Sequence, residues 1–332
     1  MSPDRPVHAR RARSHAPLVA VLAIVAALAL LAAACGGSTS ASSSTSPSAA
    51  AAPITVTDDS GHQVTLPKPA ERVVSLAPAN TEIAFAIGAG DKLVAGTVYD
   101  DYPAAAKKLP KIGDFANPSV EKIVSFQPDL VLAAGGIQAG LRSKLEGLGV
   151  KVFVVDPTSL DGVFSDLTKL GELMGVSSKA DAVVASLKQR TAAIERKVAG
   201  LPKVSVFVEI YSKPLMTAGT GTYIDDMVTL AGGTNIGDAA GSGFPTFSEE
   251  VLFKDNPQVY IATTGSMASP GQIAQRKGYS ALQAVQDHRV YVLDQNILDR
   301  PGPRLVDGLE QLAKAIHPEA FGSPSPAASA TS

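Results

Sequence analysis

Side chains that commonly carry out covalent or metal chemistry are few and scattered in this chain. Its 332 residues include one cysteine, Cys35, and five histidines. Beyond the first 16 residues the histidines are His62, His288 and His317, which have neither HxH nor HExxH spacing. There is no GxSxG motif, and Gly219–Gly221 (GTG) lacks the Lys-Ser/Thr of a phosphate-binding loop. We therefore expect no catalytic residue, no metal site and no cofactor.

Cys35 follows a segment with the parts of an export signal. Four arginines between Arg5 and Arg13 precede the uncharged run Leu18–Ala34, which ends in three alanines. This end resembles a bacterial lipobox, in which the cysteine is acylated and becomes the new N-terminus, although Leu31 stands one position early. The alternative is an uncleaved anchor, but seventeen residues span only about 25 Å at ~1.5 Å each, short of a bilayer. We expect a lipid on Cys35, holding the chain at the extracytoplasmic face of the membrane.

Several aromatic and charged residues stand where loops are expected to follow strands. Tyr99 opens the segment YDDYP, Phe115 follows Gly-Asp, Phe244 lies between Gly and Pro, and Arg300 opens RPGPR. In α/β sheets, ligands bind beyond the carboxyl ends of the strands, where such loops gather. Each aromatic could instead be a partly buried loop anchor, and Arg300 could pair with an anionic ligand or cap a strand. We take Tyr99, Phe115, Phe244 and Arg300 as candidate ligand contacts.

The surrounding pattern predicts an α/β fold. An alternating segment over Thr55–Leu66 with Asp-Asp-Ser-Gly at its centre predicts a hairpin. After it, strands and helices alternate, which favours parallel sheets covered on both faces. The expected strands are 72–77, 93–99, 129–134, 150–156, 204–210, 258–263 and 289–294. The expected helices are 81–90 (capped by Asn80 or Thr81), 120–126, 141–148, 160–174, 178–199 (capped by Ser177 or Ser178), 223–231, 248–254 and 305–316.

The two halves of the chain share a repeated unit. Glu121 opens a short predicted helix, Pro128 stands seven residues later, and a buried strand follows. Glu250, Pro257 and the strand after them repeat this arrangement. Glutamate in a first turn and proline at a helix end are also ordinary helix chemistry. Two such units at matching places nevertheless indicate duplicated lobes with a glutamate at an equivalent position on each.

Composition sets the organisation and excludes some partners. Hydrophobic and charged contents of 45% and 18% are those of a globular protein, and a net charge of −2 without a basic patch argues against nucleic acid. The Ser/Ala/Thr-rich tract before the hairpin predicts a tether. We divide the chain into a signal peptide 1–34, a tether 35–53, an N-terminal hairpin and α/β lobe 54–176, a bridging helix 177–200, a C-terminal α/β lobe 201–321 and a disordered tail 322–332.

Four phrases of the sequence carry a family resemblance. They are RVVSLAPANTEIAFAIGAGDKLVAGTVYDDYP, DFANPSVEKIVSFQPDLVLA, LMTAGTGTYIDDMVTLAGGTNI and DRPGPRLVDGLEQLAKAIHPE. Together they resemble the iron-complex/vitamin B12 class of ABC-importer substrate-binding proteins, over roughly Thr55 to Phe321. The resemblance implies two Rossmann-like lobes joined by a single rigid helix, the class III periplasmic-binding-protein arrangement. It implies a monomer that binds a metal chelate and no enzymatic activity.

The resemblance also implies roles for single residues. Glu121 and Glu250 match the lobe-top acids that dock onto arginines of an ABC permease dimer, which works with its ATPase subunits. Likeness to cobalamin binders places Tyr99, Phe115, Phe244 and Arg300 at ligand contacts, with the two phenylalanines where those binders often present tryptophan. This chain has no tryptophan. The expected ligand is a corrinoid, and a ferric siderophore or haem is the alternative.

Two other functional classes are alternatives to a transport receptor. A metallocluster-carrying reductase on the same scaffold would need cysteine or histidine ligands, which this sequence does not group. An extracellular sensor of the same fold would act without a permease. Genes for a permease and an ATPase beside the gene of this protein would argue against a sensor.

Overall fold

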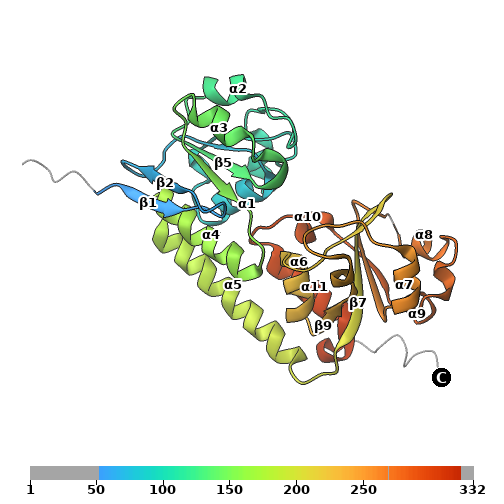
Figure 1. The fold of residues 1–332 in the computed structure, drawn as a ribbon. Helices are drawn as coiled ribbons and strands as arrows, with labels where there is room; N and C mark the ends of the chain where they lie inside the picture. The colour runs from blue at the N-terminus through green and yellow to red at the C-terminus, as the bar shows by residue number, and fades with distance from the viewer. Residues whose placement is uncertain (1–51, 268, 323–332) are drawn as a thin grey trace, which may run out of the picture. The chain divides into compact units, whose positions relative to one another are not determined.

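The computed structural model describes residues 52–267 and 269–322 (Figure 1). The predicted signal peptide, the lipidation site Cys35, nearly all of the predicted tether and the tail beyond residue 322 lie outside these residues. In the part of the chain that the structure describes, no helix is long and apolar enough to cross a membrane.

The N-terminal half begins with the predicted hairpin and continues into a parallel sheet. Strands β1 (Ile54–Thr57) and β2 (Gln63–Leu66) pair antiparallel. The sheet has the order β4-β3-β5-β6, and all of its pairings are parallel. Its strands are β3 (Val73–Ser75), β4 (Leu93–Ala95), β5 (Leu130–Ala134) and β6 (Val152–Val155). Its helices are α1 (Pro78–Ala86), α2 (Val120–Ser125), α3 (Leu141–Glu146) and α4 (Leu160–Leu173).

The C-terminal half repeats this plan with one added strand. The order β9-β7-β10-β11 is parallel throughout, and β8 pairs antiparallel with the far end of β7. The strands are β7 (Val204–Ser212), β8 (Leu215–Thr217), β9 (Gly233–Asn235), β10 (Val259–Thr263) and β11 (Val290–Leu293). The helices are α6 (Tyr223–Leu230), α7 (Glu249–Asp255), α8 (Pro270–Ala274), α9 (Gln283–Gln286), α10 (Gln295–Leu298) and α11 (Leu305–Ile316).

When the added strand β8 is left out and the parallel strands are numbered within each lobe, both sheets have the order 2-1-3-4, so the duplication read from the sequence is present in the topology. The central strands β5 and β10 bury both faces, as the continuous apolar runs predicted. Along β5, Leu130 and Leu132 enter one core while Val131 and Ala133 enter another. This alternation is the period-2 geometry of a strand. The expectation of parallel sheets covered on both faces is confirmed.

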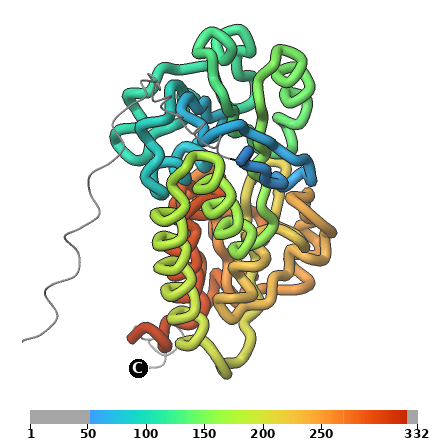
Figure 2. Tube along the Cα trace, turned by 90° about the vertical axis from the view of Figure 1, so that its left-hand side faces the viewer, coloured from blue at the N-terminus to red at the C-terminus, as the bar shows by residue number. Residues whose placement is uncertain are grey.

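Helix α5 (Ser177–Val198) lies between the two halves in sequence and packs on both. It contacts α4 of the first half and α11 of the second, and Figure 2 shows its yellow-green coils beside the red of α11. Its buried residues Leu187, Ile194 and Val198 belong to one apolar core that also contains residues of both sheets. Arg190 of α5 adds an ion pair of 2.6 Å with Asp307 of α11. Helix α5 therefore joins the lobes through a core that both of them share.

Two predicted helix caps are wrong. Helix α1 starts at Pro78, and proline suits the first helical position because the backbone N–H that it lacks would have no partner within the helix there. The N-cap residue is Ala77, whose side chain makes no capping hydrogen bond. The predicted caps Asn80 and Thr81 are buried inside α1 and bond to Leu132 O and to the Asp100 carboxylate. Helix α5 begins at Ser177, so neither predicted serine caps it. In α1, Asn80 and Thr81 hydrogen-bond to residues far along the chain instead of capping the helix locally.

The strand predicted over residues 93–99 is too long. It ends at Ala95, because Asp100 folds back and accepts hydrogen bonds from the backbone N and the hydroxyl of Thr97. Side-chain bonds of this kind draw the backbone into a turn. The short elements β8, β9, α8, α9 and α10 were not predicted from the sequence.

Candidate functional site

In open α/β sheets, ligands bind at the loops beyond the carboxyl ends of the parallel strands. Two of these loops belong to different lobes and meet directly. Residues Tyr99–Pro103 follow β4 of the N-terminal lobe, and Asp299–Arg304 follow β11 and α10 of the C-terminal lobe. Arg300 of the second loop pairs with Asp101 of the first loop and also with Glu82 of α1, whose side chain is only 1% exposed. We call Glu82, Asp101, Arg300 and Arg304 the interlobe ion cluster.

The ion cluster is closely paired. Arg300 Nη1 lies 2.6 Å from Asp101 Oδ1 and 3.0 Å from Glu82 Oε1. Arg304 donates from Nε and Nη2 to the two oxygens of Glu82, at 2.7 and 2.6 Å. The Arg304 guanidinium also lies over the Tyr102 ring, 4.2 Å from its centre. Its hydrogen bond to Glu82 raises the pKa of Arg304. Two cations and two carboxylates thus balance each other at the junction of the lobes.

Asp100 holds the first loop in shape. It is 2% exposed and accepts from Thr97 N, Thr97 Oγ1 and Thr81 Oγ1 at 3.0, 2.6 and 2.7 Å. Burial raises its pKa despite these bonds. A side chain at Gly96 would clash with the Asp100 carboxylate, so glycine is needed there. The loop directs Tyr99 outward, and 54% of that residue is exposed.

The Phe115 loop runs beside the Tyr99 loop. Val98 N donates to Gly113 O at 3.0 Å, and Gln138 Nε2 binds Phe115 O at 2.8 Å. Phe115 itself is half-buried. The structure therefore brings two of the predicted ligand residues, Tyr99 and Phe115, onto adjacent loops of the N-terminal lobe.

The other two predicted ligand residues belong to one connected region of the C-terminal lobe. Phe244 is 43% exposed, and its ring meets Tyr223 edge-on with centroids 6.2 Å apart. The Tyr223 hydroxyl donates to Asp299 O at 2.9 Å, next to Arg300. Burial raises the pKa of Asp299 to about 7. Through the bond between Arg300 and Asp101, this region adjoins the loop that carries Tyr99.

Sequence reasoning missed part of this region. Tyr102 and Asp101 were noted only as loop neighbours, and Glu82 and Arg304 were not singled out. Glu82 directly precedes the apolar residues Ile83–Ala86 of α1. This was a usable signal, because a charged residue on a buried helix face needs a partner. Val98, Ile137 and Tyr211 are also more than half exposed and lie near the carboxyl ends of β4, β5 and β7. Exposed apolar residues gathered in loops favour a contact surface.

Glu121 and Glu250 occupy equivalent positions. Each is the second residue of its helix, after the N-caps Ser119 and Ser248, and each is exposed. The units also end alike, because Gln127 and Asn256 adopt left-handed backbone (φ 47° and 44°) immediately before their prolines. Of the non-glycine residues that the structure describes, only one other, His288, has a positive φ. The two glutamates are therefore presented by the same local fold on the two lobes.

One difference separates the two glutamate helices. On α7 the neighbouring Glu249 accepts from the Tyr279 hydroxyl at 3.0 Å. Tyr279 is 1% exposed and lies under the guanidinium of Arg276, which binds both oxygens of the buried Glu209. On α2 the matching residue is Val120. The first turn of α7 is thus bonded to a buried polar network through Glu249. Glu250, the other acid of that turn, makes no such bond to Tyr279.

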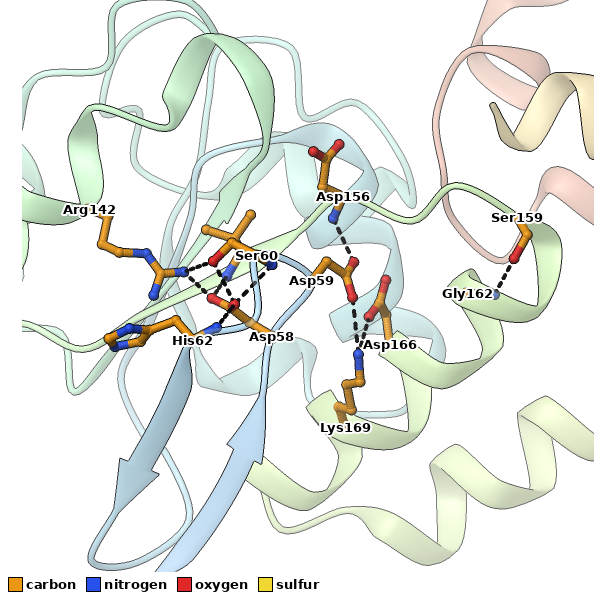
Figure 3. A network of polar contacts seen from close by, with 11 residues as sticks. Asp58, Asp59, Ser60, His62, Arg142, Asp156, Ser159, Gly162, Asp166 and Lys169 are labelled. Carbon is orange, nitrogen blue, oxygen red and sulfur yellow. Dashed lines mark hydrogen bonds and ion pairs between the residues drawn. The ribbon is translucent and has the colours of Figure 1, made fainter. Parts of the chain in front are cut away.

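A carboxylate cluster attaches the hairpin to the N-terminal lobe (Figure 3). Asp59 accepts from Asp156 N at 2.7 Å and from Lys169 Nζ at 3.0 Å. Lys169 also lies 3.4 Å from Asp166, a fully buried residue whose second oxygen has no partner. Burial and the charge of Asp59 raise the pKa of Asp166 to about 8. Asp58 adds bonds to Val154 N and to Arg142.

Two histidines and two cavities lie outside these loops. Among the described residues, no three His, Cys, Asp or Glu side chains are grouped to hold a metal ion. His62 pairs with Glu146 at 3.4 Å in the hairpin region, and His317 is 2% exposed beside Gly232. Two cavities of about 260 and 270 Å³ lie elsewhere, between β2 and β6 and at the end of α5. None of the predicted ligand residues lines them.

Known proteins are similar to this chain in sequence and in fold. The family model described as periplasmic binding protein matches residues 73–297. An uncharacterized ABC transporter substrate-binding lipoprotein of Bacillus subtilis, YvrC, is 37% identical over 81% of this chain and 87% of its own length. The structure of the periplasmic vitamin B12 binding protein BtuF of Vibrio cholerae is 30% identical, with a TM-score of 0.67 over 76% of this chain and 98% of that one.

A further solved structure names a different ligand. The periplasmic heme-binding protein RhuT of Roseiflexus sp. RS-1 is 27% identical, with a TM-score of 0.68 over 75% of this chain and 99% of that one. The two-lobed α/β arrangement is thus common to binders of different chelates. With the family model covering the region from β3 to α10, the chain belongs to the periplasmic binding protein family, whose members are transport substrate-binding proteins and not enzymes.

Proposed function

We propose that this chain is the substrate-binding protein of an ABC importer and that its ligand is a corrinoid such as cobalamin. The importer role is supported by the family and by relatives named as ABC transporter and vitamin B12-binding proteins. The ligand class is supported by the loops described above. The observation that carries it is the charge balance of the ion cluster, in which both arginines are already paired with carboxylates.

This charge balance favours a neutral chelate over an anionic one. Haem carries propionate groups and ferric catecholates are anions, so both gain most from a free guanidinium. Cyanocobalamin has no net charge and offers a broad corrin face and many amides. Tyr99, Phe115 and Phe244 supply flat aromatic surface for such a face, where ring contacts contribute ~0.5–1.5 kcal/mol each. These three residues and Arg300 remain our proposed ligand contacts.

One observation favours a haem or a ferric siderophore as the second candidate. Tyr99 and Tyr102 of the loop after β4, and Tyr211 near the carboxyl end of β7, are each about half exposed. Tyrosine is a known axial ligand of haem iron. The structure of RhuT adds a heme-binding protein of the same fold.

A ligand titration separates the candidates. The chain from residue 36 onward, purified without the signal, is titrated with cyanocobalamin, haemin and a ferric hydroxamate, following the absorbance of each chelate. We expect saturable one-to-one binding of cyanocobalamin and weaker binding of the other two. Absence of measurable cobalamin binding would reject the corrinoid, and a shifted haem absorption band lost in a tyrosine variant would establish the second candidate.

The same proposal assigns the two glutamates and the cysteine. Glu121 and Glu250 dock onto basic residues of the two permease subunits, which is supported by their equivalent exposed positions on α2 and α7. Cys35 carries the lipid that holds the protein at the extracytoplasmic face of the membrane beside its permease. This is supported by the lipoprotein name of the B. subtilis relative and by the signal that precedes Cys35.

A further inference from the structure

We propose that Asp101 determines ligand selectivity by occupying Arg300, so that the site rejects anionic chelates. The inference rests on the proposed function, because it requires the ligand to bind at the loops that carry Arg300. It concerns a residue whose side chain makes no contribution to the buried core, since 48% of it is exposed. The Arg300 side chain is 17% exposed, so it is partly open to solvent.

The division of partners within the ion cluster shows what Asp101 contributes. Glu82 is buried and already receives two hydrogen bonds from Arg304, at 2.7 and 2.6 Å. A single carboxylate facing two guanidinium groups would leave one positive charge in excess. Asp101, 2.6 Å from Arg300 Nη1, supplies the second negative charge from the solvent side. Without Asp101, the cluster would present a net cation toward the ligand loops.

Asp101 is ionised whenever the protein works near neutral pH. Its partial burial acts to raise its pKa, but the hydrogen bond and charge of Arg300 outweigh this effect and hold the pKa below its usual value. The neighbouring Asp100, not Asp101, makes the bonds that shape the loop. Replacing Asp101 by asparagine therefore changes the charge and leaves the fold of the loop in place.

The physical consequence is a change in preference between ligands. An incoming propionate or catecholate would have to displace Asp101 from Arg300 and would meet its repulsion. Charged groups at close range mainly decide which partner is accepted, because like charges placed together are costly. A corrinoid with no net charge has no carboxylate to bring against Asp101, and it can hydrogen-bond through its amides. The arrangement thus penalises one class of chelate and leaves the other nearly unaffected.

The test measures haemin and cyanocobalamin binding to wild type, Asp101→Asn, Asp101→Glu and the double variant Asp101→Asn with Arg300→Ala. We expect Asp101→Asn to bind haemin at least ~10-fold more tightly, which equals ~1.4 kcal/mol, with cobalamin affinity changed less than ~3-fold. Asp101→Glu keeps the charge and should behave as wild type. Asp91→Asn, at an exposed aspartate outside the cluster, is the control for a change in net charge.

Each outcome bears on one proposal. Unchanged haemin binding by Asp101→Asn, or a gain that persists when Arg300 is removed, would overturn the selectivity role. The double variant losing the gain would support it. A wild type that fails to bind cobalamin would instead overturn the proposed ligand, and this result is independent of the haemin ratio between the variants.

Discussion

Glu82 and Arg304 form a bidentate ion pair although they are 222 positions apart in the chain, with Arg304 Nε and Nη2 at 2.7 and 2.6 Å from the two carboxylate oxygens. Glu82 belongs to α1 of the N-terminal lobe, and Arg304 is the residue before α11 of the C-terminal lobe. The pair therefore joins the lobes at a second place, apart from the shared core around α5. A planar guanidinium fits a carboxylate in this geometry better than a lysine would.

Removing the charge of Glu82 should destabilise the protein. Glu82→Gln leaves two arginines facing one exposed aspartate, and breaking a buried pair from one side costs ~3–5 kcal/mol when both charges are fully buried. Because Arg300 and Arg304 are 17% and 18% exposed, we expect a smaller loss of about 2–3 kcal/mol. Urea unfolding measures it. Glu71→Gln, which removes an exposed pair with Lys92, should cost under ~1 kcal/mol; equal losses for both variants would contradict the prediction.

Stability should fall as the pH rises from about 4 to about 8. The pKa of Asp166 in the folded protein is about 8, well above its ordinary value of 3.8, so the folded state binds a proton that the unfolded state has released. This contribution is fully present below pH 4 and is lost as the pH rises through 8. Asp299, with a pKa of about 7, and Asp238, with one of about 6, act in the same direction at lower pH.

The Asp166 share of this dependence can be isolated. Asp166→Asn is neutral at every pH, so the melting temperature of the variant should fall less than that of wild type between about pH 5 and 8. Asp161→Asn, an exposed neighbour on the same helix, should leave the wild-type slope unchanged. Parallel curves for wild type and Asp166→Asn would show that Asp166 is not protonated in the folded protein.

Docking to the permease should depend on both equivalent glutamates and not on ligand binding. Glu121→Ala and Glu250→Ala are expected to keep wild-type affinity for the ligand and to reduce uptake, with the double variant abolishing it. The physical reason is loss of a charge pair on each lobe, which lowers affinity for the basic permease surface. Uptake of labelled ligand into cells measures it, with Glu172→Ala as an exposed control. Full uptake by the double variant would refute the docking role.

The buried network beneath α7 should affect docking through Glu250. Tyr279→Phe removes only the hydroxyl that binds Glu249 and should weaken binding to the permease several-fold without changing ligand affinity. In a Glu250→Ala background the same substitution should have no further effect, because a residue that acts through Glu250 has nothing left to position. An equal loss in both backgrounds would show a general structural role instead.

Replacing Cys35 should change where the protein is found and not what it binds. Cys35→Ser has no thiol with which to form the thioether that carries the lipid, so the exported chain should lack its lipid and appear in the soluble extracytoplasmic fraction. Membrane fractionation followed by a blot measures the distribution. Retention of Cys35→Ser in the membrane would favour the uncleaved anchor over the lipoprotein.

Most of the secondary structure could be predicted from the sequence because it depends on local patterns. The apolar runs of β5 and β10, the turn in the N-terminal hairpin and the last helix over Leu305–Ile316 all follow from nearby residues. The duplicated unit of Glu121 and Glu250 was also visible, since it repeats at one spacing. The wrong caps at α1 show the limit of such patterns, because Asn80 and Thr81 bond to residues far along the chain.

For the candidate site too, some features could be predicted from the sequence and others depend on the tertiary structure. The sequence by itself determined the class of fold, the aromatic loops, the candidate residues Tyr99, Phe115, Phe244 and Arg300, and the scarcity of catalytic groups. Only the tertiary structure decided which charge faces which. Arg300 looked equally suited to bind an anion or to cap a strand, and the fold instead places it between Glu82 and Asp101. Charge pairing across lobes depends on distances of a few ångströms between residues some two hundred positions apart, and no local pattern records those distances.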